Sequence, residues 1–326
     1  MTHNRHRSKQ PISTLNRREL LRLALGTGIG ISSGVLGMGS AFAQRTVERL
    51  PLESKTIPST GERVPLIGIG TARRFTVDID DDAAMDPLRE VVRQLPILGG
   101  NMIDTAPSYG NAEEVIGLLM QEFNNREEIF LATKVRQEDT ADALQEIEDS
   151  FRLLQTDVID LLQVHNLVNV ENMLPILREM KQEGRIRYYG ITTSFPGQYE
   201  DFERVLATEE LDFIQVDYAI DNREAEERIL PLARDRGVAV QTNLPFGRGR
   251  VFEAFGDQPI PEWAAEYDID SWAQFALKYI VSHPAVTCAI PGTATLRYLE
   301  DNLGASRGRM PDEATRQRMA DLIASA

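Results

Sequence analysis

Short runs of apolar and β-branched residues recur along the chain, and segments with helical periodicity separate them. The helical spacing is clearest in residues 141–154, where apolar side chains repeat every three or four positions and so mark one buried helix face. The members of that face are Ala141, Leu144, Ile147, Phe151 and Leu154. The eight apolar runs are residues 64–71, 101–106, 129–135, 158–165, 187–193, 213–219, 238–244 and 287–293. Near-continuous apolar runs of this kind are typical of parallel strands buried on both faces of a sheet.

This alternation of strands and helices predicts the domain organisation. Eight strands, each followed by a helix, indicate an α/β fold with a single (β/α)8 TIM barrel rather than an open sheet of two domains. No linker interrupts the alternation, so we assign residues 64–326 to the barrel. Residues 44–63 contain the turn-forming stretch PSTGER, and we expect them to form a short hairpin or cap before the first barrel strand.

Residues 1–43 have the pattern of an export signal. An uncharged apolar stretch, residues 23–44, follows a basic leader and contains an A-x-A cleavage pattern that ends at Ala43. Arg17 and Arg18 stand together at the start of the apolar run, as they do in twin-arginine signals. Because that pathway carries proteins that are already folded, we expect a folded, exported and periplasmic protein, with the twin-arginine machinery as a partner.

The leader has two other interpretations. The uncharged stretch is just long enough to span a bilayer, so an uncleaved signal would anchor the protein in a membrane. Its six glycines resemble a nucleotide-binding loop, but such a loop follows a buried strand and opens a helix, whereas these glycines follow a basic leader. We therefore expect membrane contact only through an uncleaved signal.

Composition narrows the partners. Removal of residues 1–43 takes away six basic residues and one acidic residue, and changes the net charge from −15 to −20. So acidic a protein is an unlikely match for nucleic acid or for an anionic membrane surface. Cys288 is the single cysteine, which rules out an internal disulfide bond. Only His165 and His283 remain outside the leader, and no H-x-H or C-x-x-C spacing occurs, so we expect no metal site.

Polar residues at the ends of the predicted strands suggest one kind of chemistry. In such barrels the working residues lie at the carboxyl ends of the strands and in the loops that follow. A lysine beside a tyrosine lowers the pKa of the phenol, so that the phenol can protonate a carbonyl oxygen, and an aspartate can hold that lysine charged. A histidine can donate a second hydrogen bond to the same oxygen. No side chain transfers hydride, so a nicotinamide or a flavin must supply it. The candidates are Asp104, Tyr109, Lys134 and His165.

Three stretches carry a resemblance to a known family. GGNMIDTAPSYGNAEEVIG (residues 99–117), FLATKV (130–135) and DLLQVHN (160–166) resemble the aldo-keto reductases, whose catalytic tetrad is Asp, Tyr, Lys and His in this order. Blocks along the rest of the chain after the leader are similar to later blocks of that family. The resemblance implies that Asp104, Tyr109, Lys134 and His165 form the tetrad.

The same resemblance implies a cofactor site. Members of the family bind NADP, or in some cases NAD, in extended form across the barrel mouth without a separate nucleotide-binding domain. Gln215 and Thr192 match residues that hold the nicotinamide carboxamide. The positions implied to contact the cofactor are Gly70, Thr71, Asp104, Thr192, Gln215, Asn243, Pro245, Gly247, Arg248, Gly292, Thr293, Tyr298 and Asn302.

The sequence departs from the family pattern at the cofactor site. Asn243 stands where an aromatic ring usually stacks on the nicotinamide, and Thr193 stands where the family has an asparagine. Gly292 and Tyr298 occupy positions at which many members have basic residues that grip the 2′-phosphate of NADP. Arg297 or Arg250 would then have to replace that contact.

Two functions are therefore open. The first is an exported NADP(H)-dependent reductase that converts an aldehyde or ketone, a small-molecule carbonyl substrate, to the alcohol, with Tyr109 as the general acid. The second is a catalytically impaired barrel that acts outside the cytoplasm as a binding or assembly protein. The motif order favours the first, and the departures at the cofactor site motivate the second.

Overall fold

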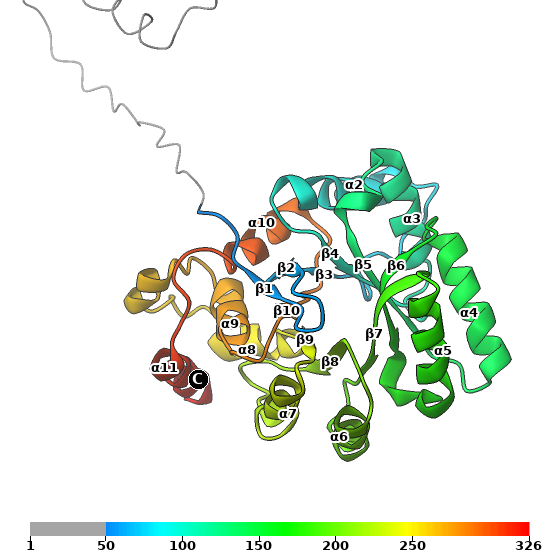
Figure 1. Ribbon diagram of the computed structural model, residues 1–326. Helices are drawn as coiled ribbons and strands as arrows, with labels where there is room; N and C mark the ends of the chain where they lie inside the picture. Colours follow the sequence, from blue (N-terminus) through cyan, green and yellow to red (C-terminus); the bar gives the residue numbers. More distant parts are fainter. Residues whose placement is uncertain (1–49, 326) are drawn as a thin grey trace, which may run out of the picture. The chain divides into compact units, whose positions relative to one another are not determined.

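The computed structural model describes residues 50–325, and eight strands form one parallel sheet at its centre (Figure 1). The strands follow chain order around the sheet, so each is hydrogen-bonded to the next. They are β3 (Ile69–Gly70), β4 (Met102–Asp104), β5 (Phe130–Val135), β6 (Ile159–Val164), β7 (Ile186–Thr192), β8 (Phe213–Asp217), β9 (Ala239–Asn243) and β10 (Cys288–Ala289).

The sheet closes on itself between its first and last strands. Ile67 pairs with Ala289, and Gly70 pairs with Gly292, both in parallel bridges. The two segments approach so closely at Gly70 that a β-carbon there would lie 2.7 Å from the carbonyl oxygen of Ile290. Only glycine allows this approach, so Gly70 has a structural role at the seam. The closed sheet with its helices confirms the (β/α)8 barrel.

Helices surround the barrel and follow its strands in turn (Figure 1). They are α2 (Asp82–Ile97), α3 (Ala112–Phe123), α4 (Thr140–Leu153), α5 (Val170–Gln182), α6 (Tyr199–Thr208), α7 (Ile229–Arg236), α8 (Arg250–Phe255), α9 (Trp272–Val281), α10 (Leu296–Gly304) and α11 (Glu313–Ala324). Among residues 50–325, none of these helices is long and apolar enough to cross a bilayer. The leader, residues 1–43, lies outside the described residues.

The segment expected as the first barrel strand, residues 64–71, is split in the structure. Its start belongs to β2 (Arg63–Pro65), which pairs antiparallel with β1 (Ser54–Thr56), and only β3 joins the barrel. Val64 and Ile57 of this hairpin are fully buried against side chains from the first residues of several barrel strands. The hydrophobic run is therefore continuous because it covers the amino-terminal end of the barrel and then enters the sheet.

The predicted helix at residues 141–154 is α4, but its buried face differs from the expected one. Ile147 and Phe151 are buried, whereas Leu144 is 41 % exposed. Ala143 and Ser150 are buried instead, and the Ser150 hydroxyl donates to the Glu113 carboxylate of α3 at 3.2 Å. The buried face of α4 therefore includes a polar residue that contacts another helix, and the spacing of apolar residues alone does not predict this.

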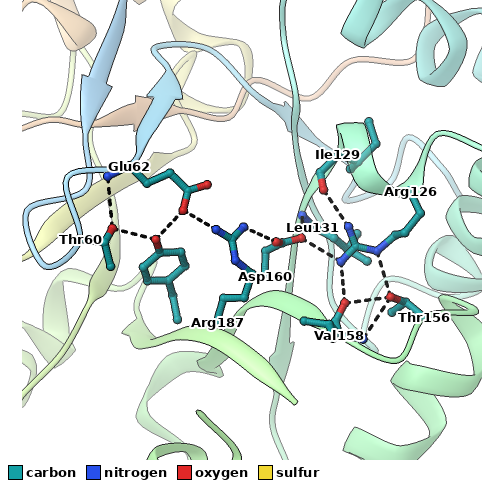
Figure 2. Close-up of polar contacts among 10 residues, drawn as sticks. Thr60, Glu62, Arg126, Ile129, Leu131, Thr156, Val158, Asp160 and Arg187 are labelled. Carbon is teal, nitrogen blue, oxygen red and sulfur yellow. Dashed lines mark hydrogen bonds and ion pairs between the residues drawn. The ribbon is translucent and has the colours of Figure 1, made fainter. Parts of the chain in front are cut away.

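Charged groups join the hairpin to the amino-terminal ends of the neighbouring strands (Figure 2). Asp160, at the start of β6, accepts hydrogen bonds from Arg126 at 2.8 Å and from Arg187 at 2.7 Å. Arg187 also pairs with Glu62 of the hairpin loop, and the Tyr188 hydroxyl donates to Glu62 at 2.6 Å. This network and the buried hairpin close the end of the barrel that lies opposite the loops after the strands.

The barrel interior changes from apolar to polar along the strands. Successive side chains of a strand point to opposite faces, so every second residue faces the barrel axis. An apolar cluster fills the interior near the amino-terminal ends of the strands, and we call it the interior cluster. It includes Met102, Phe130, Leu161, Phe213 and Ala239. Two residues further along their strands, or four in the case of Phe130, stand Asp104, Lys134, Gln163, Gln215 and Gln241, all buried. The sheet therefore gathers its polar groups at the carboxyl ends of the strands.

Candidate active site

Asp104 and Lys134 form a buried ion pair at the mouth of the barrel. Lys134 donates to Asp104 Oδ1 and to the Thr105 carbonyl oxygen, each at 2.7 Å, and the two charged side chains are 0 % and 2 % exposed. Burial by itself lowers the pKa of Lys134, but the Asp104 carboxylate and the Tyr109 hydroxyl outweigh it and raise that pKa above its ordinary value. Lys134 therefore keeps its charge, because a neutral lysine would leave the buried carboxylate without a counter-ion.

Tyr109 and His165 lie beside this pair. Tyr109 is in the loop between β4 and α3, and the Lys134 Nζ is 5.4 Å from the centroid of its ring. His165 directly follows β6, and its ring meets that of Tyr109 edge to face with 6.1 Å between the centroids. The structure thus brings together Asp104, Tyr109, Lys134 and His165, which the sequence placed at the ends of neighbouring strands.

The pKa of Tyr109 differs from the expected direction. Burial raises it above the ordinary value, and the charge of Lys134 opposes burial without overcoming it. The expectation of a lowered pKa was wrong because it counted the cation and left out the desolvation of the phenol. At neutral pH Tyr109 therefore keeps its proton, and Lys134 is placed to stabilise the phenolate that remains if that proton leaves.

His165 is neutral over the physiological range. Burial, followed by the positive charges of Lys134 and Arg136, lowers its pKa to about 3. Its buried Nδ1 has no hydrogen-bond partner within the described part of the chain. A neutral imidazole has one donor and one acceptor nitrogen, so His165 can donate one hydrogen bond to an oxygen placed at the mouth.

The loop after His165 has an unusual backbone. Asn166, Leu167 and Asn169 have φ angles of +53°, +59° and +56°. The left-handed region is uncommon for residues other than glycine and asparagine, and it costs roughly 1–2 kcal/mol for a residue such as leucine. This backbone strain is concentrated at the position where the loop turns over the barrel mouth.

Gln215 is held inside the barrel. Its amide nitrogen donates to Asp104 Oδ2 at 2.9 Å and to Gln241 Oε1 at 2.7 Å, and its oxygen accepts from Asn243 Nδ2 at 3.2 Å. The resemblance assigned Gln215 to the cofactor carboxamide. The structure shows that it also supports the tetrad, because it holds the Asp104 oxygen that does not contact Lys134.

The two threonines at the end of β7 are also bonded to protein groups. Thr192 accepts from the backbone N–H of Asn166 at 3.1 Å, and Thr193 donates to Gln198 Oε1 at 2.7 Å. The buried side-chain oxygens of Asn166 and Asn243 have no partner among the described residues. Asn166 was not predicted as a site residue, although its place directly after the histidine in VHN is a usable signal.

Several other expected cofactor residues support the scaffold. Thr71 is buried and donates to the Asp104 carbonyl oxygen at 3.0 Å. Asn302 donates to the Thr293 hydroxyl at 3.0 Å, which joins α10 to the loop after β10. Pro245 is buried in the loop after β9. In this structure these groups position the loops at the mouth, and their polar atoms are engaged.

Two further expected residues lie in the loop after β9, where Gly247 is buried and Arg248 is exposed. Gly247 and Arg248 line a hollow of about 420 Å³ after β9, together with Ser194, Asp217 and Arg250. Arg250 pairs with Asp221 at 2.8 Å.

After β10, Tyr298 is 57 % exposed and Gly292 is exposed at the barrel seam. A β-carbon on Gly292 would lie 3.5 Å from the Arg74 side chain, so Arg74 is the basic group nearest to that position. Neither Gly292 nor Tyr298 itself offers a charge to a phosphate.

A comparison with protein families agrees with this site. Residues 66–318 match the family model described as the aldo/keto reductase family. The chain belongs to this family. Its members are oxidoreductases that use NAD(P)H, and the match runs from before β3 into α11.

Individual relatives share a modest part of the sequence with this chain. The aldo-keto reductase YhdN of Bacillus subtilis is 32 % identical over 214 residues, a match that covers 60 % of this chain and 62 % of that protein. The NADH-specific methylglyoxal reductase of Escherichia coli is 26 % identical, with 62 % of this chain and 68 % of that protein covered. Among solved structures, the holo form of aldo-keto reductase AKR11C1 from Bacillus halodurans has a TM-score of 0.68 at 25 % identity, and covers 83 % of this chain and 96 % of that one.

Proposed function

We propose that this chain is an NADP(H)-dependent reductase that converts an aldehyde or a ketone to the alcohol, with Tyr109 as the general acid. The observation that carries the proposal is the contact of Tyr109 with both Lys134 and His165 above the buried Asp104. These contacts support the proposal, because a protonated phenol, a charged lysine and a neutral imidazole close to one another can together bind and protonate a carbonyl oxygen.

The proton chemistry follows from these residues. NADP(H), when bound, supplies the hydride. Tyr109 gives its phenolic proton to the carbonyl oxygen, and Lys134 stabilises the resulting phenolate by its charge. Asp104 keeps Lys134 protonated and in place. His165 orients the carbonyl oxygen through one hydrogen bond, and it does so without competing for the proton because its pKa is about 3.

Groups at the mouth fit the cofactor. The unpartnered side-chain oxygens of Asn166 and Asn243 would accept from the N–H groups of a carboxamide. Arg248 would meet phosphate groups in the hollow after β9. We prefer NADP to NAD because Arg74 lies beside Gly292, where many members of the family hold the 2′-phosphate with a lysine. NAD stays the alternative, since one relative is named as NADH-specific.

Replacement of Tyr109 by phenylalanine tests the mechanism. Removal of the hydroxyl removes the proton donor but keeps the ring, so we expect kcat for aldehyde reduction to fall by roughly 10²- to 10⁴-fold with NADPH affinity unchanged. NADPH oxidation at 340 nm and NADPH fluorescence titration measure the two quantities. A variant that turns over at the original rate would disprove the role of Tyr109.

A binding or assembly role remains the second candidate function. It is favoured by the internal bonds of Gln215 and Thr192, the residues expected to hold the carboxamide. The same NADPH titration separates the candidates. Binding followed by carbonyl-dependent oxidation supports the reductase, whereas absence of NADPH and NADH binding supports the second role.

We further propose that the protein is exported in folded form through its twin-arginine leader. The support comes from Arg17, Arg18 and the A-x-A pattern that ends at Ala43. An uncleaved leader would anchor the barrel to the membrane. The single cysteine of the protein, Cys288, is buried in the barrel and cannot form an internal disulfide bond. The fold is therefore compatible with an oxidising compartment.

A further inference from the structure

Arg136 stands at the carboxyl end of β5, at the barrel mouth. It is the first residue after β5, in which Phe130 and Ala132 belong to the interior cluster and Lys134 enters the ion pair with Asp104. Since side chains of a strand alternate between faces, Arg136 continues the inward set of this strand. It is exposed, as expected for a residue just above the closed interior.

Strand register places Arg136 beside the catalytic groups. Lys134 pairs with Gln163, and Val135 pairs with Val164, so the next position of β5 lies next to His165. Neighbouring strands are roughly 4.8 Å apart. The charge of Arg136 lowers the pKa of both His165 and Tyr109, as a nearby cation must.

The Arg136 guanidinium has no counter-ion within residues 50–325, where no ion pair or side-chain hydrogen bond involves it. The neighbouring carboxylate of Glu146 is occupied by the backbone N–H of Arg136 and by the Gln137 amide, each at 2.7 Å. Lys134 is neutralised by Asp104. In a chain with a net charge of −15, the mouth thus has a guanidinium that makes no ion pair, next to the proposed proton donor.

We propose that Arg136 selects carbonyl substrates with an anionic group, a carboxylate or a phosphate, and binds that group while the carbonyl oxygen lies at Tyr109 and His165. The guanidinium forms two parallel hydrogen bonds with a carboxylate or phosphate, which gives orientation as well as affinity. Arg136 is thus a specificity residue. The inference rests on the reductase function proposed above.

Matched substrate pairs test the proposal on the full-length protein. The carboxylate pair is 4-carboxybenzaldehyde and its methyl ester, and the phosphate pair is glyceraldehyde 3-phosphate and glyceraldehyde. We expect the native protein to have a higher kcat/KM for the charged member of at least one pair. A charge-assisted hydrogen bond of this kind corresponds to a preference of roughly ten- to hundredfold. The pair that shows the preference identifies the anionic group.

Three variants assign the preference to Arg136. Arg136→Gln should abolish it, mainly through a higher KM for the charged substrates, with a much smaller change in kcat/KM for the neutral members. Arg136→Lys should retain part of it, since lysine keeps the charge but loses the planar two-point contact. Arg234→Gln removes an exposed charge on α7 and serves as the control, with the native preference expected. NADPH affinity should be the same in all three.

The outcomes separate this inference from the function on which it rests. Turnover of the neutral aldehydes with no preference for charged ones overturns the role of Arg136 and leaves the reductase intact. Weaker NADPH binding by Arg136→Gln, with all substrates affected equally, also overturns it, because Arg136 would then contact the cofactor. Lack of turnover with every carbonyl compound overturns both.

Discussion

At the scale of single residues, the proposed acid works through a balance between burial and charge. Burial raises the pKa of Tyr109, so the phenol keeps its proton before reaction. Lys134 stays charged because Asp104 is 2.7 Å away, and its charge then stabilises the phenolate after the proton leaves. The lysine is thus needed more for the product of the proton transfer than for the resting phenol.

The low pKa of His165 leads to a test by pH. A histidine with an ordinary pKa near 6.5 would gain a charge as the pH falls through that value, whereas His165, with a pKa of about 3, stays neutral. We expect kcat/KM for reduction of a neutral aldehyde to be flat from about pH 5 to about pH 8, because Tyr109 also keeps its proton there. Initial rates across that range measure it. A drop centred near pH 6.5 in the native protein, absent in His165→Asn, would contradict the shifted pKa.

The sequence predicted the residues that belong to contiguous motifs. Asp104, Lys134 and His165 stand at fixed places relative to strand ends, so strand prediction and the topology of the barrel place them together. Asn166 and Arg136 were missed. Their importance depends on which polar atoms stay unpartnered after folding, and that depends on groups such as Thr192 and Glu146 from other elements.

At the scale of secondary-structure elements, a close backbone approach fixes the distance between two strands that support the site. Gly190 of β7 pairs with Phe213 of β8, and a β-carbon on Gly190 would lie 2.1 Å from the Phe213 carbonyl oxygen. The obstacle is backbone, so a rotamer change does not relieve it. Of these two strands, β7 ends in Thr192 and β8 carries Gln215.

Replacement of Gly190 by alanine should therefore destabilise the barrel. Overpacking of this kind typically costs about 1–3 kcal/mol in free energy of unfolding. We expect a cost near the upper end of this range, because β7 and β8 are hydrogen-bonded to each other and cannot move apart without breaking those bonds. The midpoint of urea unfolding measures it. Gly197→Ala is the matched control, since no atom lies within 4 Å of its β-carbon and its φ is not positive. Equal midpoints for the two variants would show that the β7–β8 contact relaxes easily.

The sequence pattern predicted which elements form, but it did not predict every boundary or every buried face. The run at residues 64–71 is continuously apolar, yet it serves the hairpin first and the barrel afterwards, because both are buried in the same core. In α4 the apolar Leu144 is exposed and the polar Ser150 is buried, which is the opposite of what their polarity predicts. The hydrogen bond from Ser150 to Glu113 offsets the cost of burying the serine hydroxyl. Tertiary contacts decided both cases, and local sequence does not contain them.

At the scale of the whole molecule, the closed barrel is compatible with transport in folded form. The first and last strands meet at the seam, so the fold is complete only when residues near β10 have been made. The hairpin closes the opposite end of the barrel. A pathway that accepts only extended chains would have to unfold this structure, together with any cofactor bound across its mouth, whereas the twin-arginine pathway would not.

Replacement of Arg17 and Arg18 by lysine tests this route. The substitution keeps the charge of the leader and its apolar stretch, so a signal read only through charge and hydrophobicity should still work. We expect the variant to stay in the cytoplasm in folded form and to bind NADPH there. Cell fractionation followed by detection of the barrel measures the distribution, and Arg5→Lys with Arg7→Lys provides a control in the same leader. Export of the double-lysine variant at the native level would show that the arginine pair is not what directs the protein out, and would favour an ordinary secretory signal or a membrane anchor.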